Sequence, residues 1–577
     1  MKAMGDTTRR TSPLKKWGPL AALMSVGAVV VGLLVTTSPT ASAPQRSTTP
    51  AGVAAPVGAQ GGRISRPGVV SFSAAKRAGT VDQIKWGDRC DTTKGVLKMP
   101  LAPPPECFAP FSGDNGGSTT QGVTKDTIKV VVWVSQDNDP ILSFVYRQIS
   151  SKDTGSTDFL TYQSYLKLIE TYYETYGRKV ELVRWTATGP INDPVSAAAD
   201  AETIARDIKP FAVLGGPSFT GAFGETMVKN KILCISCGGG DTNKYWIDNA
   251  PYAFSIMKNY EQNAQQTIEY VGKRVANRPA AHAGEGLKDK PRRLGIVYVT
   301  GALGTADTYG VFSQQLKERY DAEFVEKASY TDPVSLAGQA REIIARFKGA
   351  GVTTILFAGD PLAPQTLTEN AQQQDYHPEW IITGAALVDT NIFGRTYQQE
   401  QWSRAFGPSN LFARALPTVF GPQYLHKWFF GRPPASPTNA PLILPNLQLL
   451  MGVIQGMGPQ VTAQDFQDVI FNTPIYPGTP IAAQISWGDR GVWPETDFTG
   501  LDDQTEVWWD PAAVGPDESG TVAKGMWAYV DGGRRFLPGK WPKAAPDVFE
   551  PKGAVTVYRE LPPGITLPDY APIPAKN

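Results

Sequence analysis

Apolar residues in the middle of the chain alternate between short continuous runs and longer segments with helical spacing. Continuous apolar runs are typical of strands buried on both faces, and spacing of three to four residues is typical of helices. Strands that alternate with helices in this way predict βαβ units with parallel strands. The first series of predicted elements comprises strand Ile128–Val134, helix Asp158–Tyr176, strand Val180–Trp185, helix Val195–Ile208, strand Phe211–Leu214, a helix ending at Asn230, strand Ile232–Ile235 and helix Asn259–Val275.

A polar break at Ala280–Pro291 separates this series from a second one. Two successive series predict an α/β protein with two doubly wound parallel-sheet lobes, at residues 123–275 and 288–394. A ligand crevice in such sheets lies beyond the carboxyl ends of the strands. The second series comprises strand Leu294–Val299, helix Tyr309–Tyr320, strand Glu323–Ser329, helix Ser335–Ala350, strand Thr353–Ala358, helix Ala363–Gln374 and strand Trp380–Thr383.

The stretch Phe211–Asp241 contains two predicted strands that both end in glycine-containing loops. Parallel strands bring these loops to the same edge of the sheet. The hydroxyl residues Ser218, Thr220 and Ser236, together with backbone N–H groups at the helix start, could hold a carboxylate or hydroxyl group of a ligand. The alternative interpretation is a pair of ordinary strand-to-helix turns.

The N-terminus has the order of a secretory signal. Basic residues precede the apolar run Trp17–Val35, and Ala41-Ser42-Ala43 follows as a small-residue cleavage site. The run of about 19 residues is also long enough to span a bilayer if it is not cleaved. Residues 1–43 are therefore either a cleaved signal peptide or a signal anchor, and the protein is exported to the periplasm, the envelope or the extracellular space.

Residues 44–122 are rich in Pro, Gly, Ser, Thr and Ala without a sustained period, which predicts an irregular extension acting as a mobile spacer. Cys90 and Cys107 flank a proline-rich loop, and export favours a disulfide between them. Cys234 and Cys237 follow one another too closely to pair within an extended strand, so they are either free or locally paired after a strand end at Ser236. A redox role is disfavoured because this CxxC closes a strand instead of opening a helix.

The composition and net charge argue only against strongly charged partners. Hydrophobic residues make up 41% of the 577 residues and the net charge is +1, so neither nucleic acid nor an anionic membrane surface is an expected partner. The three histidines lie in loop-like contexts, and the sequence has no HExxH, GxSxG or P-loop motif. These absences favour a protein that is not an enzyme and needs neither metal nor cofactor, and we also expect it to be a monomer.

The segment Gln121–Val130 resembles the opening of mature type I solute-binding proteins of the branched-chain amino-acid transporter class. The resemblance continues through Phe211–Asp241, through Asp307-Thr308-Tyr309-Gly310 and through Gly349–Gly359, and it covers roughly Gly122–Gly394. It implies two α/β lobes that close on a small solute without chemistry, and delivery of the solute to an ABC permease.

The resemblance also implies site residues. Ser218-Phe219-Thr220 corresponds to the loop that holds the ligand carboxylate, Ser236 and Gly238–Gly240 to the neighbouring loop, and Tyr309 to the tyrosine that closes from the second lobe. Trp133 and Gln136 reach the same crevice by position, although Trp133 could equally be a core residue.

One place departs from the family pattern. Amino-acid binders have an acidic residue after the strand equivalent to Trp380–Thr383, where this chain has Gly384-Ala385-Ala386. The departure argues against a free α-amino acid as ligand. Asp360 or Asp241 could replace the missing carboxylate, or each could be a helix N-cap or turn residue.

The remainder of the chain is less regular. Within residues 395–483, Gln398–Phe406, Pro441–Met457 and Ala463–Asn472 have helical spacing and are expected to return to the first lobe. Residues 484–577 are rich in Trp and Pro, and we expect an irregular tail wrapped over the lobes; sugar stacking or protein contact are the alternatives. Two other functions remain open for the whole chain: an envelope-anchored sensor or scaffold, and a hydrolase with a cryptic site.

Overall fold

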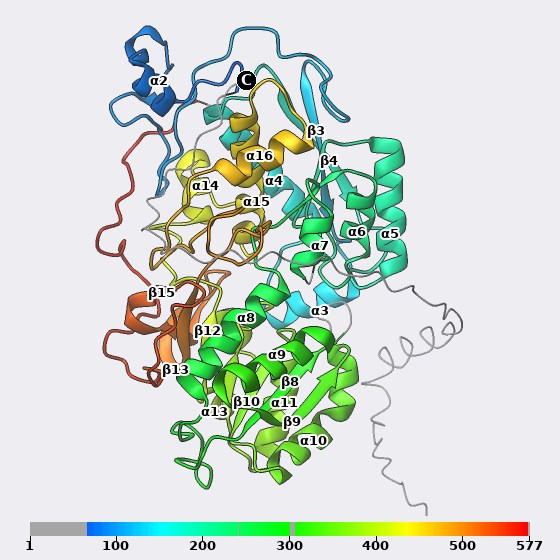
Figure 1. Ribbon diagram of the computed structural model, residues 1–577, viewed down its shortest axis with the longest axis vertical. Coiled ribbons are helices and arrows are strands. Elements are labelled where there is room, and N and C mark those ends of the chain that lie inside the picture. Colours follow the sequence, from blue (N-terminus) through cyan, green and yellow to red (C-terminus); the bar gives the residue numbers. More distant parts are fainter. Residues whose placement is uncertain (1–65, 241, 301–305, 575–577) are drawn as a thin grey trace, which may run out of the picture. The chain divides into compact units, whose positions relative to one another are not determined.

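The strands form two separate large sheets and one short hairpin in the computed structural model, which describes residues 66–240, 242–300 and 306–574. The predicted signal segment 1–43 and the candidate residue Asp241 lie outside the described residues. The prediction of an α/β protein with two parallel-sheet regions is confirmed, and the two regions are called the first and second sheet below (Figure 1).

The first sheet has five strands in the order β4-β3-β5-β6-β7, all parallel. Its centre is the apolar run of β3, where Val130, Val131 and Val132 are fully buried, because helices cover both faces. Its strands are β3 (Thr127–Val134), β4 (Lys179–Thr186), β5 (Ala212–Leu214), β6 (Leu233–Ile235) and β7 (Ala253–Phe254). The helices packed with it are α4 (Gly155–Tyr172), α5 (Pro194–Thr203), α6 (Ala222–Lys229), α7 (Asn243–Asp248), α14 (Pro422–Phe430), α15 (Ala440–Met457) and α16 (Ala463–Asn472).

The second sheet has eight strands, of which β9-β8-β10-β11-β12 are parallel. These are β8 (Leu294–Val299), β9 (Phe324–Tyr330), β10 (Thr354–Ala358), β11 (Glu379–Ile382) and β12 (Ala405–Ser409). The connecting helices are α9 (Ala306–Tyr320), α10 (Pro333–Gly349), α11 (Ala363–Gln373), α12 (Asn391–Gly394) and α13 (Gln399–Trp402). The predicted helix Gln398–Phe406 is therefore wrong in its second half, because Ala405 and Phe406 are fully buried strand residues paired with β11.

The boundary between the two lobes lies earlier in the chain than expected. The segment concerned contains helix α8 (Tyr260–Tyr270) and the π-helical turn Val271–Val275. Ile268, Tyr270 and Val271 share a buried cluster with Leu294 and Ile296 of β8. The segment was expected to close the first lobe, but the chain has already crossed to the second sheet when α8 begins, so this lobe starts near residue 260.

The C-terminal segment supplies strands, which corrects the expectation of an irregular tail. Strands β13 (Gln504–Pro516), β14 (Val522–Tyr529) and β15 (Arg535–Phe536) add to β12 as antiparallel strands. Trp509 and Trp527 are fully buried, with ring centroids 5.4 Å apart. The dense tryptophans in these strands are therefore core residues of the second sheet.

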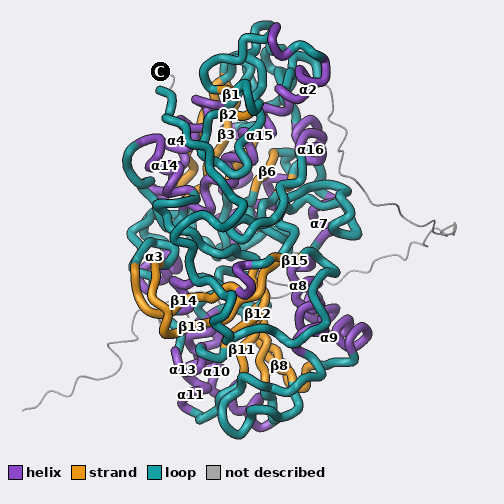
Figure 2. The backbone as a smooth tube through the Cα atoms, turned by 90° about the vertical axis from the view of Figure 1, so that its left-hand side faces the viewer, coloured by secondary structure: helices purple, strands orange, loops and turns teal. Residues whose placement is uncertain are grey.

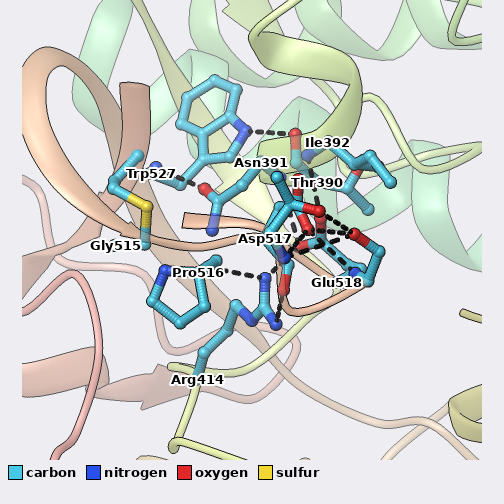
Figure 3. A network of polar contacts seen from close by, with 12 residues as sticks. Thr390, Asn391, Ile392, Arg414, Gly515, Pro516, Asp517, Glu518 and Trp527 are labelled. Carbon is cyan, nitrogen blue, oxygen red and sulfur yellow. Dashed lines mark hydrogen bonds and ion pairs between the residues drawn. The ribbon is translucent and has the colours of Figure 1, made fainter. Parts of the chain in front are cut away.

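A polar network attaches the turn between β13 and β14 to the start of α12, beside the second sheet (Figure 3). The Glu518 carboxylate accepts the N–H groups of Asn391 (3.2 Å) and Ile392 (2.8 Å), which open α12, and pairs with Arg414 at 2.8 Å. Arg395 pairs with Asp517 at 2.9 Å. This arrangement satisfies free N–H groups of a helix start with a half-buried ion pair.

The N-terminal extension is attached to the first sheet region from Arg66 onward, which corrects the expectation of a mobile spacer for this part. It contains α2 (Phe72–Ala78) and the hairpin of β1 (Cys90–Asp91) and β2 (Val96–Leu97), much of it joined by loops (Figure 2). Arg89 donates to the Tyr173 backbone oxygen (2.9 Å), and Arg178 to that of Asn115 (2.6 Å). The predicted Cys90–Cys107 disulfide is present.

Candidate functional site

The loop after β5 runs from Gly215 to Gly221 at the carboxyl edge of the first sheet, as the sequence predicts. Ser218 is exposed, so its hydroxyl is accessible to a ligand. Phe219 is half-buried, and its N–H donates to the Ile191 backbone oxygen at 3.3 Å. Thr220 is buried, and its hydroxyl oxygen accepts the Ala222 N–H at 3.2 Å, at the start of α6. Of the two predicted hydroxyl ligands, Ser218 is open and Thr220 serves the helix start.

The loop after β6 turns sharply at Ser236, which has a φ of 54°. The strand ends at Ile235, so Cys234 and Cys237 approach to a Cα–Cα distance of 5.7 Å and form a disulfide. Local pairing, one of the two alternatives left open by the sequence, is therefore what the structure has. The Ser236 hydroxyl donates to Asn446 Oδ1 of α15 at 2.8 Å, which fixes the side chain against the first sheet.

The loop after β6 touches both the loop after β5 and helix α6 through backbone atoms, which explains the glycines at these contacts. A Cβ on Gly216 would lie 2.1 Å from the Cys237 carbonyl oxygen, and a Cβ on Gly224 would lie 2.1 Å from that of Gly238. Gly238 and Gly239 both have positive φ values, of 82° and 84°. Only glycine fits these close approaches, so the loops form one packed shelf at the sheet edge.

Trp133 and Gln136 lie at the end of β3, beside this shelf. Trp133 is half-buried and packs on Phe223 of α6 with ring centroids 6.2 Å apart, which favours a core role. Its indole N–H is nevertheless buried without a hydrogen-bond partner among the described residues. Gln136 is half-buried, and its backbone oxygen accepts the Asp139 N–H at 3.1 Å.

On the second sheet, Asp360 does not offer a free carboxylate. It is fully buried, and Oδ1 accepts the N–H groups of Leu362 (2.8 Å) and Ala363 (3.0 Å) at the start of α11. Its Oδ2 accepts the Tyr330 hydroxyl at 2.6 Å. Burial raises the pKa of this carboxyl. The N-cap residue of α11 is Leu362, so Asp360 holds the turn that leads into this helix. Tyr309 lies on α9, and its side chain is outside the described residues.

A cluster beyond the same edge of the first sheet was missed by sequence reasoning. Asn439 donates to both oxygens of Asp158 (3.0 and 3.1 Å) and to the Tyr146 hydroxyl (2.9 Å), while Ser436 also donates to Asp158. Burial raises the pKa of Asp158 to about 6. Tyr146 and Asp158 precede Ser436 and Asn439 by almost 300 positions in sequence, so no local pattern indicates this cluster.

A second unpredicted network surrounds the half-buried Lys258, where the chain crosses between the sheets. Its ammonium donates to the Gln266 side chain, to Asn410 Oδ1 (3.2 Å) and to the Asp503 backbone oxygen (2.8 Å). Burial lowers the pKa of Lys258 to about 7. Burial also raises the pKa of Asp502 to about 7 and that of Asp497 to about 6.

Neither the cavities nor the candidate metal ligands indicate a different functional site. A cavity of about 290 Å³ lies at the opposite end of the first sheet, lined by residues such as Phe211, Lys231 and Thr462, and another of about 490 Å³ is lined by Gln484, Asp503 and Arg535. Within the described ranges, no group of three or more His, Cys, Asp or Glu side chains is placed to hold a metal ion. Among the same residues, α15 is the one helix long and apolar enough to cross a membrane, and it is mostly buried in the core.

Comparison with known proteins gives similar folds only. No protein-family model matches the chain, and no curated protein matches it. A solute-binding protein of an ABC transporter from R. palustris, in complex with 4-hydroxybenzoate, is 13% identical with a TM-score of 0.47, over 74% of this chain and all of that one. A branched-chain amino acid transporter substrate-binding protein from Streptococcus pneumoniae, in complex with isoleucine, is 14% identical with a TM-score of 0.45, over 70% of this chain and all of that one.

A fatty acid ABC transporter substrate-binding protein from Thermomonospora curvata is 14% identical with a TM-score of 0.46, over 72% of this chain and 95% of that one. These three solved structures are binding proteins of ABC transporters. Identities and TM-scores at this level transfer neither a ligand nor a residue role to this chain.

Proposed function

We propose that this chain is an exported solute-binding protein that captures a small polar or anionic solute between its two sheet regions and delivers it to an ABC permease. The observation that carries the proposal is the glycine shelf at the carboxyl edge of the first sheet, with the exposed Ser218 beside the start of α6. Ligands of open α/β sheets bind at such edges, where backbone N–H groups and hydroxyls can hold a carboxylate or hydroxyl oxygen.

The residues at the carboxyl edge of the second sheet favour a ligand without an ammonium group. Asp360 is occupied by its three hydrogen bonds, and the backbone of Ser409 and Asn410 packs against Gly384, where a Cβ would lie 2.7 Å from the Asn410 nitrogen. Neither place offers a carboxylate to a free α-amino acid. An organic acid or a hydroxylated solute fits the donors of the first sheet better.

The experiment is a thermal-shift screen of the purified exported chain against a library of organic acids, sugars and amino acids, followed by calorimetry. We expect one solute to bind at one-to-one stoichiometry and to be recovered unchanged. Recovery of a converted product would support the hydrolase alternative instead. Genes for a permease and an ATPase beside this one would favour transport over an envelope-anchored sensor.

A further inference from the structure

Helix α3 (Pro140–Gln148) follows the carboxyl end of β3, where the apolar pattern predicts no element. Its start is tied to the first sheet region through Asp139, which is fully buried. Asp139 Oδ1 accepts the N–H groups of Ile141 and Leu142, each at 2.9 Å, and Oδ2 accepts the Ile191 N–H at 2.9 Å. Ile191 belongs to the loop after β4, so the carboxylate joins the helix start to the edge of the first sheet.

The other end of α3 reaches the second sheet. Ile149 is only 8% exposed and belongs to the buried cluster that contains Val297 and Val299 of β8 and Tyr330 of β9. Val145 packs against the same cluster. The helix therefore connects two sheets that otherwise have separate strands, and Figure 1 shows it at the level between them.

The chain then returns to the first sheet region through polar contacts. Ser151 and Thr438 hydroxyl oxygens are 3.0 Å apart, and Asp153 Oδ2 accepts the Asn439 N–H at 2.9 Å. Asn439 also donates to the Tyr146 hydroxyl. Residues 139–153 are thus anchored by hydrogen bonds at both ends on the first sheet side, and touch the second sheet through apolar side chains near Ile149.

We propose that residues 139–153 form a strap that holds the two sheet regions together before a solute arrives. When the two sheet regions separate, the contact of Ile149 with the second sheet breaks. An apolar contact suits a releasable end because its separation leaves no buried polar group unpaired, whereas the hydrogen-bonded anchors persist. The inference rests on the proposed function, since the strap leaves β3 at the edge where a solute would bind.

Double electron–electron resonance without any solute tests the strap directly. Spin labels on Val195→Cys of α5 and Glu342→Cys of α10 report the distance between the two sheet regions, and both positions are exposed. All four native cysteines are in disulfides, so labelling is selective. Ile149→Asp places a charge in the buried cluster, and Phe144→Asp, at a 44% exposed position of the preceding helix α3, is the matched control.

We expect Ile149→Asp to shift most of the distance distribution to longer values and to increase hydrogen exchange in residues 140–149, while Phe144→Asp leaves both unchanged. Ile149→Ala should shift a smaller fraction and covers the case in which the aspartate variant does not fold. An unchanged distance distribution in the folded Ile149 variants, with or without faster exchange, would overturn the strap. This outcome is independent of whether a solute is found, so it separates failure of the strap from failure of the proposed function.

Discussion

The carboxyl edges of the two sheets use polar residues in opposite ways. After β5 of the first sheet, Ser218 is left exposed and the loop is held by close backbone packing between glycines. After β10 of the second sheet, Asp360 is fully buried and both of its oxygens accept hydrogen bonds from the protein. A polar residue that follows a strand is therefore a ligand candidate only where the start of the next helix does not already use it.

The shelf of the first sheet should tolerate an added Cβ atom less well than an exposed position on a helix of the second sheet. Gly216→Ala places a Cβ 2.1 Å from the Cys237 carbonyl oxygen, and we expect a loss of roughly 3 kcal/mol or more in the free energy of unfolding because backbone must move. Chemical denaturation measures it. The control is Gly338→Ala on α10, where no atom lies within 4 Å of the added Cβ and helix propensity predicts a gain of up to about 1 kcal/mol. Equal stability of the two variants would contradict the packed shelf.

Asp360 should prove structural. Asp360→Ala removes the acceptor of two N–H groups and leaves the Tyr330 hydroxyl without this carboxylate, so we expect a loss of about 2–3 kcal/mol in the free energy of unfolding. The affinity for a solute, measured on the folded fraction at low temperature, should stay within about threefold. A large loss of affinity at unchanged stability would return Asp360 to the ligand site.

The crossing between the sheets should give the protein a distinctive pH dependence. Burial raises the pKa of Asp502 to about 7, with Asp497 acting in the same direction and Lys258 in the opposite one. Between about pH 4 and 7 the folded chain then keeps a proton that the unfolded chain releases. Stability therefore falls as pH rises, by up to about 1.4 kcal/mol per pH unit for this group.

Asp502→Asn should flatten the slope of unfolding free energy over this pH window, since the amide does not titrate. Asp531→Asn is the control, because Asp531 is exposed and its side chain is 69% accessible. Denaturant titrations at half-unit pH steps give both slopes. If Asp502→Asn and the parent have the same slope, proton uptake by Asp502 does not accompany folding.

Most of the long strands and helices of residues 123–394 could be predicted because local periodicity reflects burial, whereas α3 was not predicted. The runs Ile128–Val134 and Leu294–Val299 agree with β3 and β8 almost residue for residue. The C-terminal strands escaped prediction because prolines and glycines interrupt them, and because their partner β12 lies about 100 residues earlier. Sheet pairing at that distance leaves no periodic signal of its own.

The site was predictable only in part. The glycine loops after β5 and β6 and the Cys90–Cys107 pair follow from local sequence, and residues 215–240 and the disulfide lie as expected. Asn446, which holds Ser236, comes from α15 more than 200 residues later. Local sequence does not show this long-range contact of Ser236. Thr220 differs from Ser218 by its burial and by its local contact with the Ala222 N–H.

The most direct test of the account is the affinity of Ser218→Ala for the solute found by screening, measured by calorimetry beside Thr220→Ala and Tyr309→Phe. Loss of a donor to a charged group should weaken binding by about 1.5–3 kcal/mol, or roughly ten- to a hundredfold, with the unfolding temperature of Ser218→Ala unchanged. The account predicts this loss for Ser218→Ala. Wild-type affinity in all three variants would contradict it and move the binding site away from the carboxyl edge of the first sheet.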